Sequence, residues 1–524
     1  MSADPSSLSR SSGSGRRVAL FACDILLGAA AALGQAPWGL WPVSVAAFAL
    51  IVWRVATTTS ARDGALSSLR AGIGYFALSM FWIIEPFLVE PEIYGWLAPF
   101  ALTGIAVGGA LFWAVPTWLA LLPVRGAAMR GVAFAAAIVL SDWLRGWLFT
   151  GLPWALGGHI WIDSPVGQIA ALAGSIGLSA LTMLLALLPN LLRALDNNRM
   201  RGLLSGAALS LAVLAGAWAY GSARLSTPLP DTTRPQILRL VQPNAEQRLK
   251  WDPYWSGVFF QRLIDLSSGP TAEGGRPDVV IWPETAVNFL LEHAGTAPQD
   301  IKTAIEAPLL LGIQRVEGNR YFNSFAEFRR DGTIGQIYDK FHLVPFGEYT
   351  PWGDAMSRLG ISAFAARYGN GYTPGDGAHV LRGLGAGLPP VQVLICYEAV
   401  FSRHLITQGA ERPEWLLQIT NDAWFGTQSG PWQHLAQARL RAIESGLPLI
   451  RVANTGVTAV IDARGTIKAQ LDLGIEGRLD AALPASLAST PWSKLGDWPA
   501  VLLAALALLG AIVGSGLKRN PSAG

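Results

Sequence analysis

Long apolar stretches occupy most of the first 220 residues of the chain, and one more lies near its C-terminal end. A helix needs about 20 apolar residues to cross the roughly 30 Å hydrocarbon core of a bilayer. Eight stretches approach or exceed this length, and we predict that each forms a membrane-spanning helix. They are residues 18–35, 39–56, 71–88, 95–121, 132–149, 166–189, 203–220 and 498–516.

Between the seventh and eighth stretches, the pattern changes to short apolar runs that alternate with helix-like spacing. Dense apolar runs predict buried strands at 237–241, 278–282, 309–313, 391–395, 415–420 and 458–461. Helical spacing occurs at 252–267 and 432–445. This alternation predicts a layered α/β domain that follows a membrane domain of about eight helices.

These patterns predict the domain boundaries. The order is a disordered cytoplasmic N-terminus at 1–17, seven spans within 18–221, a proline-containing linker at 222–235, an α/β domain at 236–490, a final span within 491–516 and a cytoplasmic tail at 517–524. A cleaved signal peptide within 1–36 is an alternative for the first span, and it leaves the remaining orientation unchanged.

Composition supports the membrane assignment. Hydrophobic residues make up 51% of the chain and charged residues only 14%, whereas soluble proteins contain about 25% charged residues. The formal net charge of +3 and the absence of a Lys/Arg-rich run argue against a nucleic-acid partner.

Basic residues occur in alternate connections between the predicted spans. The basic connections contain Arg16, Arg17, Arg54, Arg62, Arg70, Arg125, Arg130, Arg193, Arg199, Arg201, Lys518 and Arg519. The intervening connections carry almost no basic residues; segment 150–165 has none. Because basic loops stay in the cytoplasm, this pattern predicts that both termini are cytoplasmic and that the α/β domain is extracytoplasmic.

Three polar residues stand at or after strand-like runs. Glu284 ends one run, Cys396 ends another, and Lys340 follows the turn at Asp331-Gly332. Taken singly, they can be a strand terminator, a core thiol and a surface charge. Together they can supply a base, a nucleophile and a cation for acyl transfer, because a thiol with a pKa of about 8.5 needs activation. The only other cysteine, Cys23, lies in the first apolar stretch, so we expect no disulfide.

Other catalytic classes lack support in the sequence. The six His residues are scattered without a second His or Cys at ligand spacing. The chain also shows no phosphate-binding or dinucleotide glycine pattern and no Gly-x-Ser-x-Gly elbow. Zinc enzymes and serine hydrolases are therefore disfavoured.

Five local motifs occur in a characteristic order. They are 240–244 (Leu-Val-Gln-Pro-Asn) with Trp251 following, 340–349 (Lys-Phe-His-Leu-Val-Pro-Phe-Gly-Glu-Tyr), 395–398 (Ile-Cys-Tyr-Glu), 421–426 (Asn-Asp-Ala-Trp-Phe-Gly) and 431–434 (Pro-Trp-Gln-His). With Trp-Pro-Glu at 282–284, they resemble the nitrilase superfamily and its Glu-Lys-Cys triad. Over nearly the whole chain, the sequence resembles its membrane-embedded branch, the apolipoprotein N-acyltransferases of the bacterial inner membrane.

The resemblance implies a nitrilase-like αββα sandwich joined to a helical membrane domain, without metal or other cofactor. It also implies that Cys396 takes an acyl chain from a phospholipid and passes it to the α-amino group of a diacylated apolipoprotein. Glu284 would be the base, and Lys340 would stabilise the oxyanion. The matching supporting positions are Glu348, Tyr397, Glu398, Trp251, Trp424 and Asn421. We expect a monomer.

Two other functions stay open at the level of sequence. One is a membrane-tethered nitrilase or amidase that hydrolyses a small amide. The other is a receptor or transporter, which would need ionisable residues within the spans; the candidates are Asp24, Glu85, Asp142 and Arg145. Asp142 and Arg145 could pair with each other or mark a polar face near a lipid entry. Segment 352–373 could be a mobile arm that admits acyl chains or a packed loop.

Overall fold

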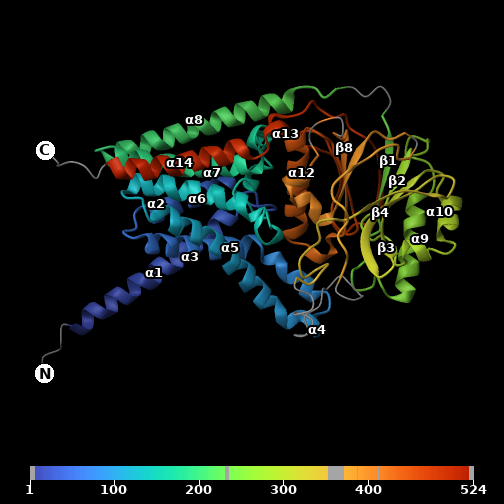
Figure 1. Ribbon diagram of the computed structural model, residues 1–524, viewed down its shortest axis with the longest axis horizontal. Helices are drawn as coiled ribbons and strands as arrows, with labels where there is room; N and C mark the ends of the chain where they lie inside the picture. Colours follow the sequence, from blue (N-terminus) through green and yellow to red (C-terminus); the bar gives the residue numbers. More distant parts are fainter. Residues whose placement is uncertain are drawn as a thin grey trace. The chain divides into compact units, whose positions relative to one another are not determined.

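The structure is a computed structural model that describes residues 6–230, 235–351, 371–385, 387–406, 409 and 412–517. The chain forms two compact units (Figure 1). The helical unit contains Met1–Ser226 and Leu495–Gly524, and the α/β unit contains Thr227–Lys494. The segment predicted as an arm or loop, 352–373, lies outside the described residues up to position 370.

Within the residues that the structure describes, the helical unit contains eight long helices and several short ones. The long helices are α1 (Ser6–Ala32), α2 (Trp41–Ala56), α3 (Ala61–Ser79), α5 (Ala98–Leu121), α6 (Ala127–Arg145), α7 (Ala170–Leu195), α8 (Arg199–Ser226) and α14 (Trp498–Leu517). The short ones are η1 (Phe81–Leu88), α4 (Pro91–Tyr94), η2 (Gly95–Leu97), η3 (Leu148–Thr150), η4 (His159–Trp161) and η5 (Pro165–Ile169).

All eight apolar stretches contain helix, but eight spans are not confirmed. Among the described residues, five helical segments are long and apolar enough to cross a bilayer. The predicted span 71–88 is interrupted, because α3 ends at Ser79 and meets η1 at a bend of 46°. The first two stretches form the shorter apolar helices Val18–Ala32 and Trp41–Ala56.

Several predicted boundaries also shift. Helix α6 begins at Ala127 and ends at Arg145, whereas the sequence pattern placed it at 132–149. Helix α8 continues to Ser226, so the predicted linker at 222–235 begins as helix. Residues 1–5 of the predicted disordered N-terminus lie outside the described residues, and α1 begins at Ser6.

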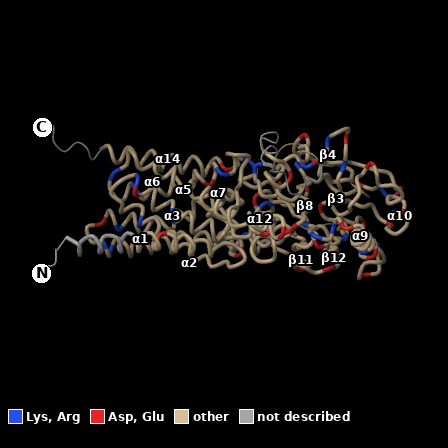
Figure 2. The backbone as a smooth tube through the Cα atoms, turned by 90° about the horizontal axis from the view of Figure 1, so that it is seen from below, with Lys and Arg blue, Asp and Glu red and all other residues tan. Residues whose placement is uncertain are grey.

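Charged residues are sparse along the helical unit and frequent throughout the α/β unit (Figure 2). Within the helical unit, the N-terminal end of α1 and the C-terminal end of α14 lie at the same end in both views (Figures 1 and 2).

The connection between α6 and α7 is a mostly buried loop, residues 151–162. Arg145 pairs with Asp142 at 2.9 Å and donates from Nη1 to the carbonyl oxygen of Trp154 at 2.8 Å. Asp142 accepts from the backbone N–H of Gly157 at 3.0 Å. The two ionisable residues therefore pair, and they also bind the backbone of this irregular segment, whose buried polar groups need such partners.

The α/β unit contains two six-stranded sheets, ordered β12-β1-β2-β3-β4-β5 and β11-β10-β9-β8-β7-β6. The strands of the first sheet are β1 (Ile237–Gln242), β2 (Val279–Ile281), β3 (Leu309–Glu317), β4 (Arg320–Phe328), β5 (Ile334–Asp339) and β12 (Gly477–Ala482). Those of the second are β6 (Val380–Leu381), β7 (Val391–Ile395), β8 (Trp415–Thr420), β9 (Leu449–Ala453), β10 (Thr458–Ile461) and β11 (Ile467–Leu471).

The two sheets pack face to face between two layers of helices. Side chains from both sheets, such as Leu240, Ile281, Val393 and Ile419, form one common core. Helices α9 (Pro253–Ser267) and α10 (Ala297–Ala304) cover the outer face of the first sheet. Helix α12 (Gly430–Ser445) covers the outer face of the second sheet, where Trp492 of α13 (Pro491–Leu495) also packs. The predicted αββα sandwich is therefore observed, and all six predicted strands are present.

Candidate active site

Cys396 occupies a sharp turn at the end of a buried strand. Strand β7 ends at Ile395, and Cys396 begins the short helix η7 (Cys396–Val400). Its φ of 50° is in the left-handed region, which is rare for a residue with a side chain and recurs at functional sites. The residue is buried, with 6% of its surface exposed. The strand-end position inferred from the sequence is therefore correct, and the turn directs the thiol away from the strand.

Glu284, Lys340 and Glu348 come together although they lie on two separate connections. Glu284 follows β2, Lys340 follows β5, and Glu348 belongs to the connection after Lys340. The Lys340 Nζ lies 2.9 Å from Glu348 Oε1 and 3.4 Å from Glu284 Oε1. All three side chains are buried. Burial by itself lowers the pKa of Lys340, but the two carboxylates outweigh it and hold that pKa well above its ordinary value.

Asn323 joins the two carboxylates, and the sequence analysis did not select it. Its Nδ2 donates to Glu284 Oε1 at 2.7 Å and to Glu348 Oε1 at 2.9 Å. Its Oδ1 is buried without a hydrogen-bond partner among the described residues. Asn323 lies in β4, which β3 separates from β2 in the sheet, so no local signal in the sequence marks its contact with Glu284.

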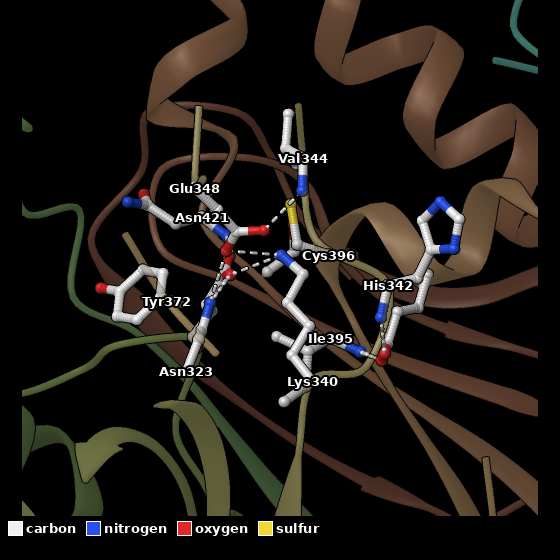
Figure 3. Close-up of polar contacts among 12 residues, drawn as sticks. Asn323, Lys340, His342, Val344, Glu348, Tyr372, Ile395, Cys396 and Asn421 are labelled. Atoms are coloured by element: carbon white, nitrogen blue, oxygen red, sulfur yellow. Dashed lines mark hydrogen bonds and ion pairs between the residues drawn. The ribbon is translucent and has the colours of Figure 1, made fainter. Parts of the chain in front are cut away.

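The thiol of Cys396 faces this charged cluster. Figure 3 shows the sulfur and the Lys340 amine directed toward the same region as the Glu348 carboxylate. Burial raises the pKa of the Cys396 thiol, Glu284 raises it further, and Lys340 partly opposes them. Because the thiol is therefore protonated at neutral pH, it needs a base before it can attack. Among the carboxylates, Glu284 has the largest electrostatic effect on the pKa of the thiol.

Glu398 connects the lysine segment to the cysteine turn. Its carboxylate is fully buried and accepts from the backbone N–H groups of Phe341 at 2.8 Å, His342 at 3.2 Å and Ile395 at 2.8 Å. The Tyr338 hydroxyl also donates to it, at 3.0 Å. Burial raises the pKa of Glu398 to about 7, against the effect of the backbone donors. Glu398 thus holds the residues next to Lys340 beside those next to Cys396.

A second buried polar group lies behind the cysteine backbone. The carbonyl oxygen of Cys396 is 3.2 Å from both Gln418 Nε2 and His434 Nε2. His434 Nδ1 is 3.0 Å from Asp422, which also pairs with Arg451. Burial opposes ionisation of Asp422, but Arg451 lowers its pKa to about 2. The motifs at 421–426 and 431–434 contain two of these residues, and the structure shows that they support the turn.

The other predicted positions divide into two groups. The backbone N–H of Asn421 donates to Glu284 Oε2 at 2.8 Å, so Asn421 belongs to the cluster. Tyr397 is buried and packs edge-to-face on Phe401. Trp251 and Trp424 are partly exposed and stand outside the hydrogen bonds described above. In the described part of the chain, no three His, Cys, Asp or Glu side chains form a group that could hold a metal ion.

Gly312 allows the close approach that positions Glu284. A Cβ at this position in β3 would lie 2.5 Å from Glu284 Cα. The Ala286 N–H donates to the Gly312 carbonyl oxygen at 2.8 Å, which holds the chain after Glu284 against β3. A larger residue here would displace the backbone of the carboxylate.

Both units of the chain are similar to known protein families. Residues 27–188 match the apolipoprotein N-acyltransferase N-terminal domain, and residues 256–491 match the carbon-nitrogen hydrolase family. An apolipoprotein N-acyltransferase of Rhodopseudomonas palustris is 38% identical over 93% of each chain. Another, from Caulobacter vibrioides, is 38% identical over 94% of each chain. A solved CN-hydrolase superfamily protein of Xanthomonas campestris covers 52% of this chain and 97% of its own, with 19% identity and a TM-score of 0.35.

Proposed function

The chain belongs to the apolipoprotein N-acyltransferase family, and from this premise we propose how its α/β unit acylates lipoproteins. The donor is a membrane phospholipid. The acceptor is the α-amino group of the N-terminal S-diacylglyceryl-cysteine of an apolipoprotein. The observation that carries the mechanism is the cluster in which Glu284 and Lys340 act on the buried thiol of Cys396.

In the first half-reaction, Glu284 accepts the proton of Cys396 Sγ while the thiolate attacks the carbonyl carbon of the phospholipid ester. The Lys340 ammonium, held by Glu348, stabilises the oxyanion, and the backbone N–H of Tyr397 can assist it. When the C–O bond breaks, the leaving oxygen of the lysophospholipid takes the proton from Glu284. The enzyme then carries the acyl chain as a thioester on Cys396.

In the second half-reaction, the lipoprotein amine attacks the thioester carbonyl. Glu284 accepts a proton from the attacking nitrogen, the C–S bond breaks, and the Cys396 thiolate regains that proton. The product is an amide on the lipoprotein cysteine. Because each lipid substrate is confined to the membrane, a helical unit that holds the site at the bilayer raises the frequency of productive encounters.

We further propose that both termini are cytoplasmic and that the α/β unit faces the periplasm. The distribution of basic residues supports this orientation. The ends of α1 and α14 at one end of the helical unit are compatible with it (Figure 1). Protease protection in sealed, right-side-out and inverted vesicles tests the proposal, and an α/β unit cleaved only in inverted vesicles would contradict it.

The mechanism is tested by mass spectrometry of the full-length protein after exposure to phospholipid alone. We expect a fatty-acyl mass on the peptide that contains Cys396, together with released lysophospholipid. The Cys396→Ala protein should show neither, and Cys396→Ser at most a trace, because serine is a poorer nucleophile here. Cys23→Ala is the matched control and should react like the unmodified chain. Full activity of Cys396→Ala would overturn the mechanism.

A tethered nitrilase or amidase is the alternative for the same cluster. It would hydrolyse a small amide without forming a fatty-acyl thioester from phospholipid. The same experiment therefore separates the two functions.

A further inference from the structure

Lys250 is a buried cation that the triad does not include. It lies in the connection between β1 and α9, and 5% of its surface is exposed. Its Nζ lies 3.5 Å from the backbone carbonyl oxygen of Glu284. An ammonium has three N–H donors, and in the described part of the chain this is the only hydrogen bond that Lys250 makes. A buried ammonium with so little compensation is costly unless a nearby negative charge stabilises it.

The carboxylate cluster contains such a charge. Glu284 and Glu348 accept from the same Asn323 amide nitrogen, so the two carboxylates are close neighbours. Lys340 supplies one positive charge for the pair. Two like charges at this range disfavour each other's ionised form. The contacts of Lys340 thus place one positive charge beside two buried carboxylates.

Apart from Lys340, none of the titratable groups around Glu284 supplies a positive charge. These groups are Lys340 and Glu348 in the connection after β5, Tyr372 in the segment before β6, and Cys396 after β7. Burial raises the pKa of both Cys396 and Tyr372, so both are neutral at pH 7. Burial lowers the pKa of Lys250 to about 8, and Glu284 opposes that effect. At pH 7, Lys250 is thus still mostly charged.

We propose that Lys250 is a positioning residue that keeps the Glu284 carboxylate ionised and oriented, so that Glu284 can accept the Cys396 proton at neutral pH. With Lys250, the cluster contains two carboxylates and two ammonium groups and is neutral overall. Lys250 acts through Glu284 and contacts no substrate atom. This assignment rests on the proposed role of Glu284 as the base.

The test is the pH dependence of the first half-reaction in Lys250→Met. Full-length protein in detergent is mixed with phosphatidylethanolamine micelles without lipoprotein, and lysophospholipid release is followed through a single turnover. Loss of the ammonium disfavours the ionised form of Glu284, so the acidic limb of the rate profile should move up by about one pH unit. The rate deficit should be about tenfold on that limb and should shrink at higher pH.

Two variants sharpen the result. Arg248→Met removes an exposed cation two residues away and should leave the acidic limb in place. Lys250→Arg retains the charge and should restore the position of the limb even if the rate is lower. A simple folding defect lowers the rate equally at every pH, so a pH-independent deficit in Lys250→Met would overturn the assignment. So would a change in KM alone, which indicates substrate contact. Lysophospholipid release by Cys396→Ala would instead refute the proposed function.

Discussion

Both units bury oppositely charged side chains, but the two groups have different partners. In the helical unit, Asp142 and Arg145 pair with each other and also bind backbone groups of the loop 151–162. In the α/β unit, the ions of the cluster formed by Glu284, Lys340 and Glu348 bind mainly other side chains, through Lys340 and Asn323. The first arrangement satisfies the main chain, and the second concentrates charge beside a thiol.

This difference predicts that substitutions in the first group mainly reduce stability and that substitutions in the second mainly reduce activity. Removing an ion that binds buried backbone leaves main-chain groups and a partner charge uncompensated, which destabilises the fold. Neutralising one carboxylate of the Glu284, Lys340 and Glu348 cluster leaves Lys340 with its other carboxylate, and Lys250, whose pKa burial lowers to about 8, can release its proton, so the fold loses less than when main-chain groups lose their partners. The presence of a buried ion pair therefore does not by itself predict the effect of a substitution. That effect depends on which groups still have a partner after one ion is removed.

The largest effect is expected for Glu284→Gln. The amide has nearly the shape of the carboxylate but cannot accept the Cys396 proton. Acyl-enzyme formation should fall by about a thousandfold, within the range of general-base catalysis. Lysophospholipid release in a single turnover measures the rate, and a thermal unfolding curve in detergent measures stability. A normal rate would remove Glu284 as the base, and an unfolded protein would contradict the separation of roles.

Arg145→Met should do the opposite in the helical unit. It leaves the Asp142 carboxylate and the Trp154 carbonyl oxygen without their partner in a buried region. We expect a loss of about 3–5 kcal/mol in the free energy of unfolding. The double variant Asp142→Asn with Arg145→Met should recover part of that loss, because it leaves no unpaired charge. An unfolding midpoint unchanged in the single variant would show that the loop does not depend on this pair.

Glu398→Gln tests a carboxylate that does both: it binds backbone N–H groups and positions the site. Burial raises the pKa of Glu398 to about 7, so the folded state binds this proton more tightly than the unfolded state. Its contribution to stability is then fully present below the ordinary glutamate pKa and is lost as the pH rises through 7. The loss amounts to about 3 kcal/mol between the two limits.

The variant lacks this titration. The free energy of unfolding of Glu398→Gln should therefore fall below that of the unmodified protein by a smaller amount at pH 8 than at pH 5. Denaturant unfolding at the two pH values measures it. A difference that is constant with pH would show that Glu398 does not titrate in this range. Acylation should also slow in the variant, because the Lys340 and Cys396 segments lose a common partner.

The smallest effect is expected for Arg201→Met. Arg201 pairs with Asp196 at 2.8 Å, as close as the pair at Asp142, but its side chain is 72% exposed. Water stabilises both separated charges, so such pairs contribute little. We expect no measurable change in the unfolding midpoint and normal activity. A clear loss of stability would show that distance, more than burial, determines the effect of an ion pair in this unit.

The sequence by itself determined the class of the two units and the elements that carry the chemistry. Apolar length identified the helical unit, and dense apolar runs placed six strands, since burial on both faces leaves a local pattern. Strand ends and motif order then selected Glu284, Lys340, Cys396 and Glu348. Apolar length did not reveal the bend within 71–88, because a bend in an apolar stretch changes neither its composition nor its length.

Only the tertiary structure decided which residues meet. Asn323 contacts Glu284 across 39 positions in the chain, and Tyr338 contacts Glu398 across 60. Lys250 reaches the backbone of Glu284 from 34 positions away. No periodic pattern in the sequence marks these residues, because their hydrogen-bond partners are distant in the chain and only the fold brings them together. The chemistry could be predicted from local signals, whereas the charge balance that supports it depends on long-range packing.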